Sequence, residues 1–191
     1  MLTLDDLIAF VDQHFRRSAF RLELLDAYEV ASDGTDFARY LAGEPSPTPE
    51  RVQPWIDQLR AERAAGVVRQ RVHVLRRPLS PYLRYECEWA YTLNAAEGED
   101  VRILDVSGRP DLTEALRRSA KATRDFWIFD DRWPVVMHYD NAGQFVGADV
   151  DQDVQPYREA RDLTVRLSEP FTGWWAAHPD EHRSHREHSA A

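Results

Sequence analysis

The segment Phe126–Val150, FWIFDDRWPVVMHYDNAGQFVGADV, decides the fold prediction. Its first four residues are all apolar, which is typical of a short strand that is covered on both faces. Two segments rich in strand-forming residues follow, 133–140 and 144–150, and the connector between them ends in Gly143. A three-residue hairpin loop commonly has a glycine in the left-handed conformation at this position. We therefore predict a strand followed by an antiparallel hairpin.

The expected register of this hairpin makes both of its faces mainly apolar. Tyr139 opposes Phe145 and His138 opposes Val146 in that register. One face then carries Val135, Met137, Tyr139 and Phe145, and the other carries Val136, His138, Val146 and Ala148. Because two apolar faces need cover on both sides, the predicted class is α/β, with mixed α+β as the alternative. The architecture is a central mixed sheet with a C-terminal antiparallel hairpin and helices on both faces.

Hydrophobic periodicity predicts the elements outside this segment. Apolar residues at three- and four-residue steps predict helices at 3–15, 35–41, 49–65, 111–122 and 155–167, with a further helical stretch through Trp174 and Trp175. Thr3 and Asp6 resemble a capping box at the start of the first of these helices. Strand patterns occur at 20–25, 67–75 and 101–106. Residues 80–94 alternate like a strand, but Ser80-Pro81 is typical of a helix start. Since typical strands have about five or six residues, a helix is favoured over 80–94.

The length of 191 residues predicts a single globular domain over residues 1–177. Residues 178–191 are polar and rich in histidine, which predicts a flexible tail. No apolar run approaches the roughly 20 residues that span a bilayer, and the acidic N-terminus is unlike a signal peptide. We expect a cytoplasmic protein without a membrane partner, in which the lone thiol of Cys87 stays reduced.

Composition excludes several classes of chemistry. The formal net charge is −9, and Lys121 is the only lysine among the 24 basic residues. A P-loop is absent, and Schiff-base chemistry would depend on Lys121 alone. A single cysteine excludes an intramolecular disulfide and a multi-cysteine zinc site. The acidic charge disfavours direct binding of nucleic acid, and no motif predicts a cofactor. Arginine is the only abundant cation, so an anionic ligand would be held by guanidinium groups.

Asp130 and Asp131, directly after the apolar strand, and His138 are the candidate catalytic residues. Carboxylates at a strand end could hold a divalent cation or act as a general base. The simpler interpretation is a solvated turn in which Arg132 neutralises a neighbour. His138 would need a carboxylate partner, for which Asp130, Asp131 and Asp149 are candidates. Its apolar neighbours in the predicted hairpin favour a core histidine instead.

Two further sets of residues are candidates for binding. Arg84, Glu86 and Arg102 lie in a mixed-charge zone that could hold a small anionic effector, although a solvated salt-bridged face explains the same pattern. Trp174 and Trp175 are adjacent, so both cannot face one core from a helix, and one is expected to contact a partner or to line a cleft. The tail histidines His178, His182, His185 and His188 predict only adventitious metal affinity.

Several short motifs together resemble an uncharacterised actinobacterial family, domain of unknown function 6879, over about residues 7–165. They are FRLE at 20–23, YEV at 28–30, PLSPYLRYE at 78–86, EGEDVR at 97–102, FWIFDD at 126–131, HYD at 138–140 and GQFVG at 143–147. The resemblance implies a small intracellular protein, often encoded beside helix-turn-helix regulators, and supplies no catalytic residues. The order of elements also resembles half of a phospholipase-D-type fold, but Ser119 stands where that motif has histidine.

These observations predict a cytoplasmic regulatory protein that binds an effector or a partner. The expected partners are a helix-turn-helix regulator or a small anionic effector, and a homo-oligomer is possible. The alternative is a small enzyme with a carboxylate–histidine site, using metal-assisted hydrolysis as one option.

Overall fold

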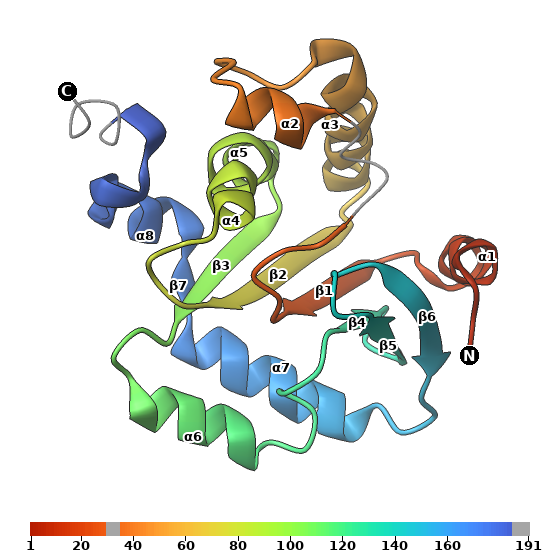
Figure 1. Cartoon of the computed structure of the whole chain (residues 1–191). Helices are drawn as coiled ribbons and strands as arrows, with labels where there is room; N and C mark the ends of the chain where they lie inside the picture. Colours follow the sequence, from red (N-terminus) through yellow and green to blue (C-terminus); the bar gives the residue numbers. More distant parts are fainter. Residues whose placement is uncertain (30–34, 185–191) are drawn as a thin grey trace.

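A computed structural model describes residues 1–29 and 35–184 of the chain. Within this part, a seven-stranded mixed sheet has the order β6-β5-β4-β1-β2-β3-β7 (Figure 1). Its parallel centre consists of β1 (Ser18–Glu23), β2 (Val68–Leu75) and β3 (Asp100–Asp105). The antiparallel strands are β4 (Phe126–Phe129), β5 (Trp133–Tyr139), β6 (Phe145–Val150) and β7 (Glu169–Pro170). The fold is mixed α+β, with the predicted C-terminal hairpin.

The two parallel connections place their helices on one face of the sheet, as Figure 1 shows. The β1–β2 connection carries α2 (Asp36–Leu41) and α3 (Pro49–Ala64). The β2–β3 connection carries α4 (Pro81–Tyr85), the π-helical segment η2 (Glu86–Tyr91) and α5 (Thr92–Glu97). Residues 80–94 are therefore helical, as favoured from Ser80-Pro81, and the Ser80 hydroxyl accepts a hydrogen bond from the N–H of Leu83.

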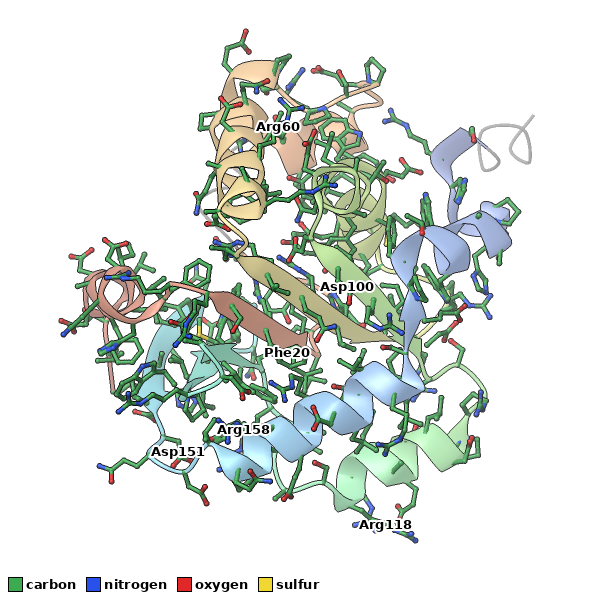
Figure 2. All side chains as sticks on the ribbon, turned by 180° about the vertical axis from the view of Figure 1, so that it is seen from behind. Phe20, Arg60, Asp100, Arg118, Asp151 and Arg158 are labelled. Atoms are coloured by element: carbon green, nitrogen blue, oxygen red, sulfur yellow. The ribbon has the colours of Figure 1, made fainter. Side chains whose placement is uncertain are left out.

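The opposite face of the sheet is covered by α6 (Pro110–Arg118) and α7 (Gln155–Leu167) (Figure 1). Alternate residues of the strands point to this face, and they form the largest apolar core with Leu112 and Leu116 of α6 and Tyr157 of α7. Phe20 lies between β1 and α7 (Figure 2). The predicted cover on both faces is confirmed.

The two ends of the sheet are covered by the first and last helices. At the β4–β6 end, α1 (Leu4–His14) packs through Leu7, and the predicted capping box of Thr3 and Asp6 is present. At the β3–β7 end, α8 (Phe171–Ala177) buries Phe171 and Trp174 against the sheet. Among the described helices, none combines the length and the apolar content that crossing a membrane requires.

The hairpin register differs from the prediction beside Gly147. Tyr139 opposes Phe145 as expected, but His138 opposes Gly147 instead of Val146 because the ladder is irregular between His138 and Tyr139. The shift moves Ala148 to the face that carries Val135, so its predicted face was wrong. Val146 is exposed as a result. A single extra residue cannot be recognised from alternation alone.

Residues 178–184 pack against the domain, so the expected loose tail does not begin at residue 178. The short helix η3 (Pro179–Glu181) follows α8, and Glu181 is buried. Its carboxylate accepts hydrogen bonds from the Arg84 side chain at 2.9 Å and from the Leu79 N–H at 3.2 Å. The prediction for 185–191, including His185 and His188, falls outside the described residues.

One face of the parallel centre is charged where the other is apolar. Phe20 and Leu22 of β1 and Val72 and Val74 of β2 point toward α6 and α7. The alternate residues of each strand point the other way, toward α2–α5. These are Arg21 and Glu23 of β1 and Arg69, Arg71 and His73 of β2. Burying so many polar groups in the middle of a sheet is costly unless each has a partner. This face carries the site described next.

Candidate functional site

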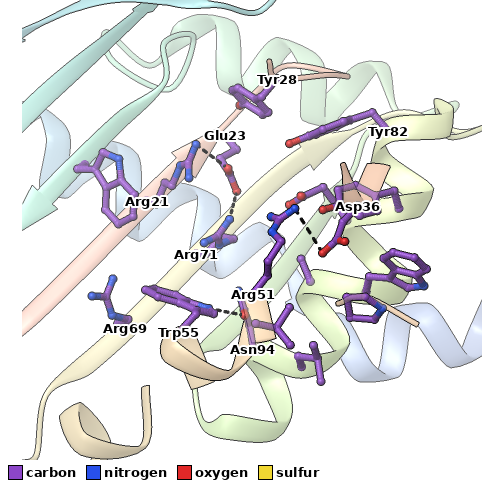
Figure 3. Close-up of a pocket in the computed structure, with 18 of the residues that line it drawn as sticks. Arg21, Glu23, Tyr28, Asp36, Arg51, Trp55, Arg69, Arg71, Tyr82 and Asn94 are labelled. Atoms are coloured by element: carbon purple, nitrogen blue, oxygen red, sulfur yellow. Dashed lines mark hydrogen bonds and ion pairs between the residues drawn. The ribbon is translucent and has the colours of Figure 1, made fainter. Parts of the chain in front are cut away.

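A cavity of about 690 Å³ lies between β1 and β2 and the helices α2, α3, α4 and η2 (Figure 3). Arg21 and Glu23 of β1 and Arg69 and Arg71 of β2 form its floor. Side chains from the helices line the rest, namely Asp36, Arg51, Trp55, Tyr82, Tyr85, Glu86, Trp89 and Asn94. Volumes of about 300–1,000 Å³ are usual for small-molecule sites, so the cavity has the size of a ligand site.

Glu23 is the centre of the floor, and it is 2% exposed. Its carboxylate pairs with Arg21 at 2.9 Å and Arg71 at 2.9 Å, and it accepts a hydrogen bond from the Tyr91 hydroxyl at 3.1 Å. Burial alone would raise the pKa of Glu23, but the two guanidinium groups outweigh burial and lower that pKa to about 2. Glu23 is therefore an ionised counter-ion at neutral pH.

Arg71 and His73 extend this network under the helices. Arg71 also donates to Glu99 at 3.0 Å, so it contacts two carboxylates, Glu23 and Glu99. His73 is completely buried between the Tyr91 hydroxyl at 2.7 Å and the carbonyl of Leu25 at 3.0 Å. Burial lowers the pKa of His73 and outweighs the neighbouring Glu23 carboxylate, which acts in the opposite direction. The network fixes the orientation of the floor arginines.

Tyr28 closes one side of the cavity and is held by a buried carboxylate. Its hydroxyl donates to Asp125 and accepts hydrogen bonds from the N–H groups of Leu24 at 3.2 Å and Leu25 at 3.3 Å. Burial raises the pKa of Asp125 to about 6 and the pKa of Tyr28 well above 10. All hydrogen-bonding positions of this hydroxyl are in use, which is typical of a structural group.

Asp36 joins the two helices of the roof. It is 2% exposed, and its carboxylate accepts a hydrogen bond from the Thr48 hydroxyl at 2.6 Å, before α3 begins. It also pairs with Arg39 at 3.1 Å and with Arg51 at 3.6 Å (Figure 3). Hydrogen bonds and these two cations lower the pKa of Asp36 against the effect of burial, which is the largest single influence. Asp36 thus links a cavity-lining arginine to α2.

Two tryptophans form a second wall, and each is held firmly. The Trp55 ring N–H donates to Asn94 at 2.8 Å, and the Arg69 guanidinium lies 5.0 Å from the ring centre. Trp127 stacks on Phe129 with 10° between the ring planes, and the Arg21 guanidinium lies 5.0 Å from its ring. Tyr28, Tyr82, Tyr85 and Trp89 also line the cavity, and they belong to one aromatic cluster that includes Tyr40 outside the lining.

Four arginines line the cavity, Arg21, Arg51, Arg69 and Arg71, against three carboxylates, Glu23, Asp36 and Glu86. Each guanidinium carries five N–H groups, and among the described residues Arg71 donates to Glu23 and Glu99 while Arg21 meets Glu23 and Tyr139. The oxygens of Glu23 and Asp36 already accept from several donors. A molecule in the cavity therefore gains most by supplying acceptors, and an anion does so most strongly.

The candidate catalytic residues do not meet in one place. His138 is paired with Asp149 at 2.8 Å and its side chain is 31% exposed, so it is not a core histidine. Asp131 pairs with Arg158 at 3.1 Å and Arg161 at 2.5 Å. Asp130 follows Phe129, which pairs with Trp133 at the far end of β5 from His138, roughly 16 Å away at 3.3 Å per residue. Asp130 therefore lies far from His138, whereas Asp149, the third candidate partner, is paired with it.

Asp130 has a local role that the sequence did not reveal. Its carboxylate accepts hydrogen bonds from the N–H groups of Arg16, Arg17 and Ser18 at 3.0, 2.6 and 3.0 Å, directly before β1. Its φ of 52° lies in the left-handed region, which asparagine and aspartate tolerate better than most residues. Asp130 therefore fixes the entry of the central strand.

We expect Asp130→Ala to lower the free energy of unfolding by about 1–2 kcal/mol, because it removes three backbone contacts and strains a left-handed position. Asp130→Asn keeps the conformation and one acceptor, so it should cost less than Asp130→Ala. Urea unfolding monitored by tryptophan fluorescence measures both values. Equal stability of Asp130→Ala and wild type would contradict this role.

The candidate binding residues are divided between the cavity and other contacts. Glu86 lines the cavity, but Arg84 pairs with Glu181 at 2.9 Å and Arg102 donates to the Ser168 carbonyl at 2.9 Å. Trp174 is fully buried, so it has no surface for a partner. Trp175 is half-buried, and His182 stacks on its ring at 4.1 Å. Within the described residues, no group of three or more potential metal ligands is present.

Sequence reasoning missed the floor of the cavity, although one signal was present. Arg69 and Arg71 look like interruptions of a β-branched strand, whereas they are alternate residues of one face. β1 has the same alternation as β2, with Arg21 and Glu23 on one face of the strand. Two strands predicted for the interior of a sheet, each with charges at every second position, indicate a buried polar face and hence a cavity.

The part of the chain that matches a known protein family contains the whole cavity. Residues 5–176 match a family described as a domain of unknown function, DUF6879. The range contains every residue that lines the cavity, whereas Glu181 lies beyond it. No curated protein matches the chain.

Proposed function

We propose an effector-binding role for this chain, which belongs to the DUF6879 family of domains of unknown function. It binds a small anionic molecule in the cavity over β1 and β2 and acts in regulation. The single observation that carries the proposal is the buried floor, where Arg21 and Arg71 are oriented around Glu23. Oriented guanidinium groups recognise anions because their fixed fork of N–H groups matches carboxylate and phosphate oxygens.

The polar groups of the cavity favour binding over catalysis. The hydroxyl of Tyr28 uses its donor and both acceptor positions within the protein, and Glu23 is held as an ionised counter-ion by two arginines. A general base needs a pKa near the working pH and access to the substrate proton. Neither Tyr28 nor Glu23 meets both requirements. Polar groups whose hydrogen-bonding positions are all used within the protein fit a pre-organised binding site instead.

Asp36 provides a route from the ligand to the protein surface. An anion that engages Arg51 competes with the ion pair between Arg51 and Asp36, which lie 3.6 Å apart. Asp36 also holds Arg39 and Thr48, so a change at Arg51 alters how α2 contacts the start of α3. A partner that contacts these helices, such as a helix-turn-helix regulator, would receive the signal.

We expect Arg51→Gln to weaken binding of the effector by about 10- to 100-fold, the value of one charge-assisted contact. The protein is first screened against small carboxylates and phosphates by thermal shift, and each compound that binds is then titrated calorimetrically. Arg77→Gln is the matched control, because the Arg77 side chain is 32% exposed against 31% for Arg51 and pairs with Asp105 outside the cavity.

Equal affinity of Arg51→Gln and wild type for every compound that binds would contradict the site. A screen in which no compound binds at concentrations up to about 1 mM would contradict the proposed function itself. A loss that Arg77→Gln shares would indicate an effect of net charge instead of contact.

A further inference from the structure

We infer that the effector is a planar aromatic anion of about the size of a mononucleotide; this inference rests on the proposed function. The aromatic residues of the cavity carry the first step. Trp55 lies beside the arginines of the floor and Tyr82 lies across the cavity from it (Figure 3), and Trp127 and Trp89 also line the cavity. Two aromatic walls of one cavity present π-surfaces on which a flat ring packs well.

Contacts within the protein hold Trp55 in place. Trp55 is held at its ring N–H by Asn94 and on its ring by Arg69. Arg69 is itself fixed by Glu62, whose carboxylate accepts from the Arg69 Nη2 at 2.8 Å, and by the ring of Phe15 at 4.8 Å. A ring that is already ordered loses little conformational entropy when a ligand stacks on it, so these contacts favour binding.

The aromatic and cationic surfaces lie next to each other, which defines the shape of the ligand. Arg21 touches Trp127 and Tyr28 with its guanidinium and pairs with Glu23 at its edge. Arg71 lies one strand away at the same depth, with Arg51 above it (Figure 3). A molecule with a ring at one end and an anionic group at the other can therefore stack and accept hydrogen bonds together.

The volume of the cavity favours this ligand over smaller anions. At about 690 Å³, the cavity is far larger than an isolated phosphate or acetate needs and is in the range of drug-sized ligands. Such a small ion would leave the aromatic walls unoccupied. A neutral aromatic molecule of the same size would not form the charge-assisted hydrogen bonds that an anion forms with these arginines, so it should bind more weakly.

The test uses two aromatic anions, each with a neutral and a non-aromatic counterpart. Adenosine monophosphate is compared with adenosine and ribose 5-phosphate, and 2-naphthoate is compared with 2-naphthamide and cyclohexanecarboxylate. Calorimetric titration of the full chain should show at least one aromatic anion binding 10-fold or more tightly than both of its counterparts. The phosphate and carboxylate arms identify which anionic group the arginines accept.

Two tryptophan variants locate the ring. Trp55→Leu should reduce the affinity for the aromatic anion at least 10-fold and leave the affinity of its non-aromatic counterpart unchanged. Trp133→Leu is the control, because Trp133 is also half-buried but contacts His14 and Arg132 outside the cavity. A loss of the same size in both variants would overturn the placement of the ring.

The remaining outcomes distinguish this inference from the proposed function. If non-aromatic anions bind as tightly as aromatic ones and Arg51→Gln weakens their binding, the proposed function stands. The inference that the ligand carries an aromatic ring is then wrong. If the neutral aromatic compounds bind as tightly as the aromatic anions, the inference that the ligand is an anion is wrong. If none of the panel binds while other compounds from the screen do, the ligand class is overturned.

Discussion

Glu23→Gln is expected to lower the free energy of unfolding by about 3–5 kcal/mol, the largest effect of any substitution considered. The variant keeps the size of the side chain but removes the only charge that Arg21 and Arg71 share. Arg71 is 7% exposed and retains Glu99, whereas Arg21 has no second carboxylate among the described residues. Urea unfolding at pH 7 measures the loss.

Glu114→Gln is the matched control for this experiment. Glu114 also pairs with two arginines, Arg117 and Arg118, at 2.8 Å each, but on the exposed side of α6. Exposed ion pairs contribute about 0–1 kcal/mol because solvent screens them. A loss in Glu23→Gln no larger than in Glu114→Gln would show that the floor is hydrated, contradicting a buried and oriented network.

The same carboxylate predicts a pH dependence. The pKa of Glu23 is about 2 in the folded protein, whereas an unperturbed glutamate has a pKa of 4.5. The ionised form of Glu23 therefore stabilises the fold. The contribution is complete above pH 4.5 and is lost as the pH falls from 4.5 toward 2. The difference in unfolding free energy between wild type and Glu23→Gln should therefore shrink by about 3 kcal/mol over this window.

Glu181→Gln is expected to lower the free energy of unfolding by about 2–3 kcal/mol, the second-largest effect. The buried carboxylate holds Arg84 of α4 and the N–H of Leu79, and its amide replacement cannot compensate the Arg84 charge. The side chain of Arg84 is 18% exposed, so water replaces the lost partner only in part. Thermal and urea unfolding both report this loss.

The neighbouring Asp180→Asn provides the control, because Asp180 is exposed and the substitution should change stability by less than about 0.5 kcal/mol. Equal stability of Glu181→Gln and wild type would show that residues 178–184 do not contribute to the fold. The substitution tests the structural role of a segment that lies beyond the family domain, so effector affinity is expected to remain unchanged.

Local patterns predicted most of the secondary structure. Ser80-Pro81 started a helix, Thr3 and Asp6 formed a capping box, and the Gly143 loop closed a hairpin, because each depends on residues close in sequence. The π-helical turn of η2 and the irregularity at His138 were not predicted, since neither changes the period enough to be recognised. Both depend on how the element packs.

The candidate site was less accessible to sequence reasoning than the fold. Glu23, Arg71 and Glu99 come from three different strands or their ends, and only the sheet order brings them together. Conversely, Asp130 and His138 lie close in sequence but at opposite ends of β5. The expectation that guanidinium groups would hold an anion remains a prediction, although different arginines now carry it.

A crystal structure of the chain with the tightest-binding aromatic anion would show whether the cavity over β1 and β2 is the effector site. We expect the anionic group to lie within hydrogen-bond distance of Arg21, Arg51 or Arg71 and the ring to pack against Trp55 or Trp127. A ligand bound outside the cavity, or one bound inside it with the anionic group turned away from these arginines, would show that the cavity is not an anion site of the kind proposed.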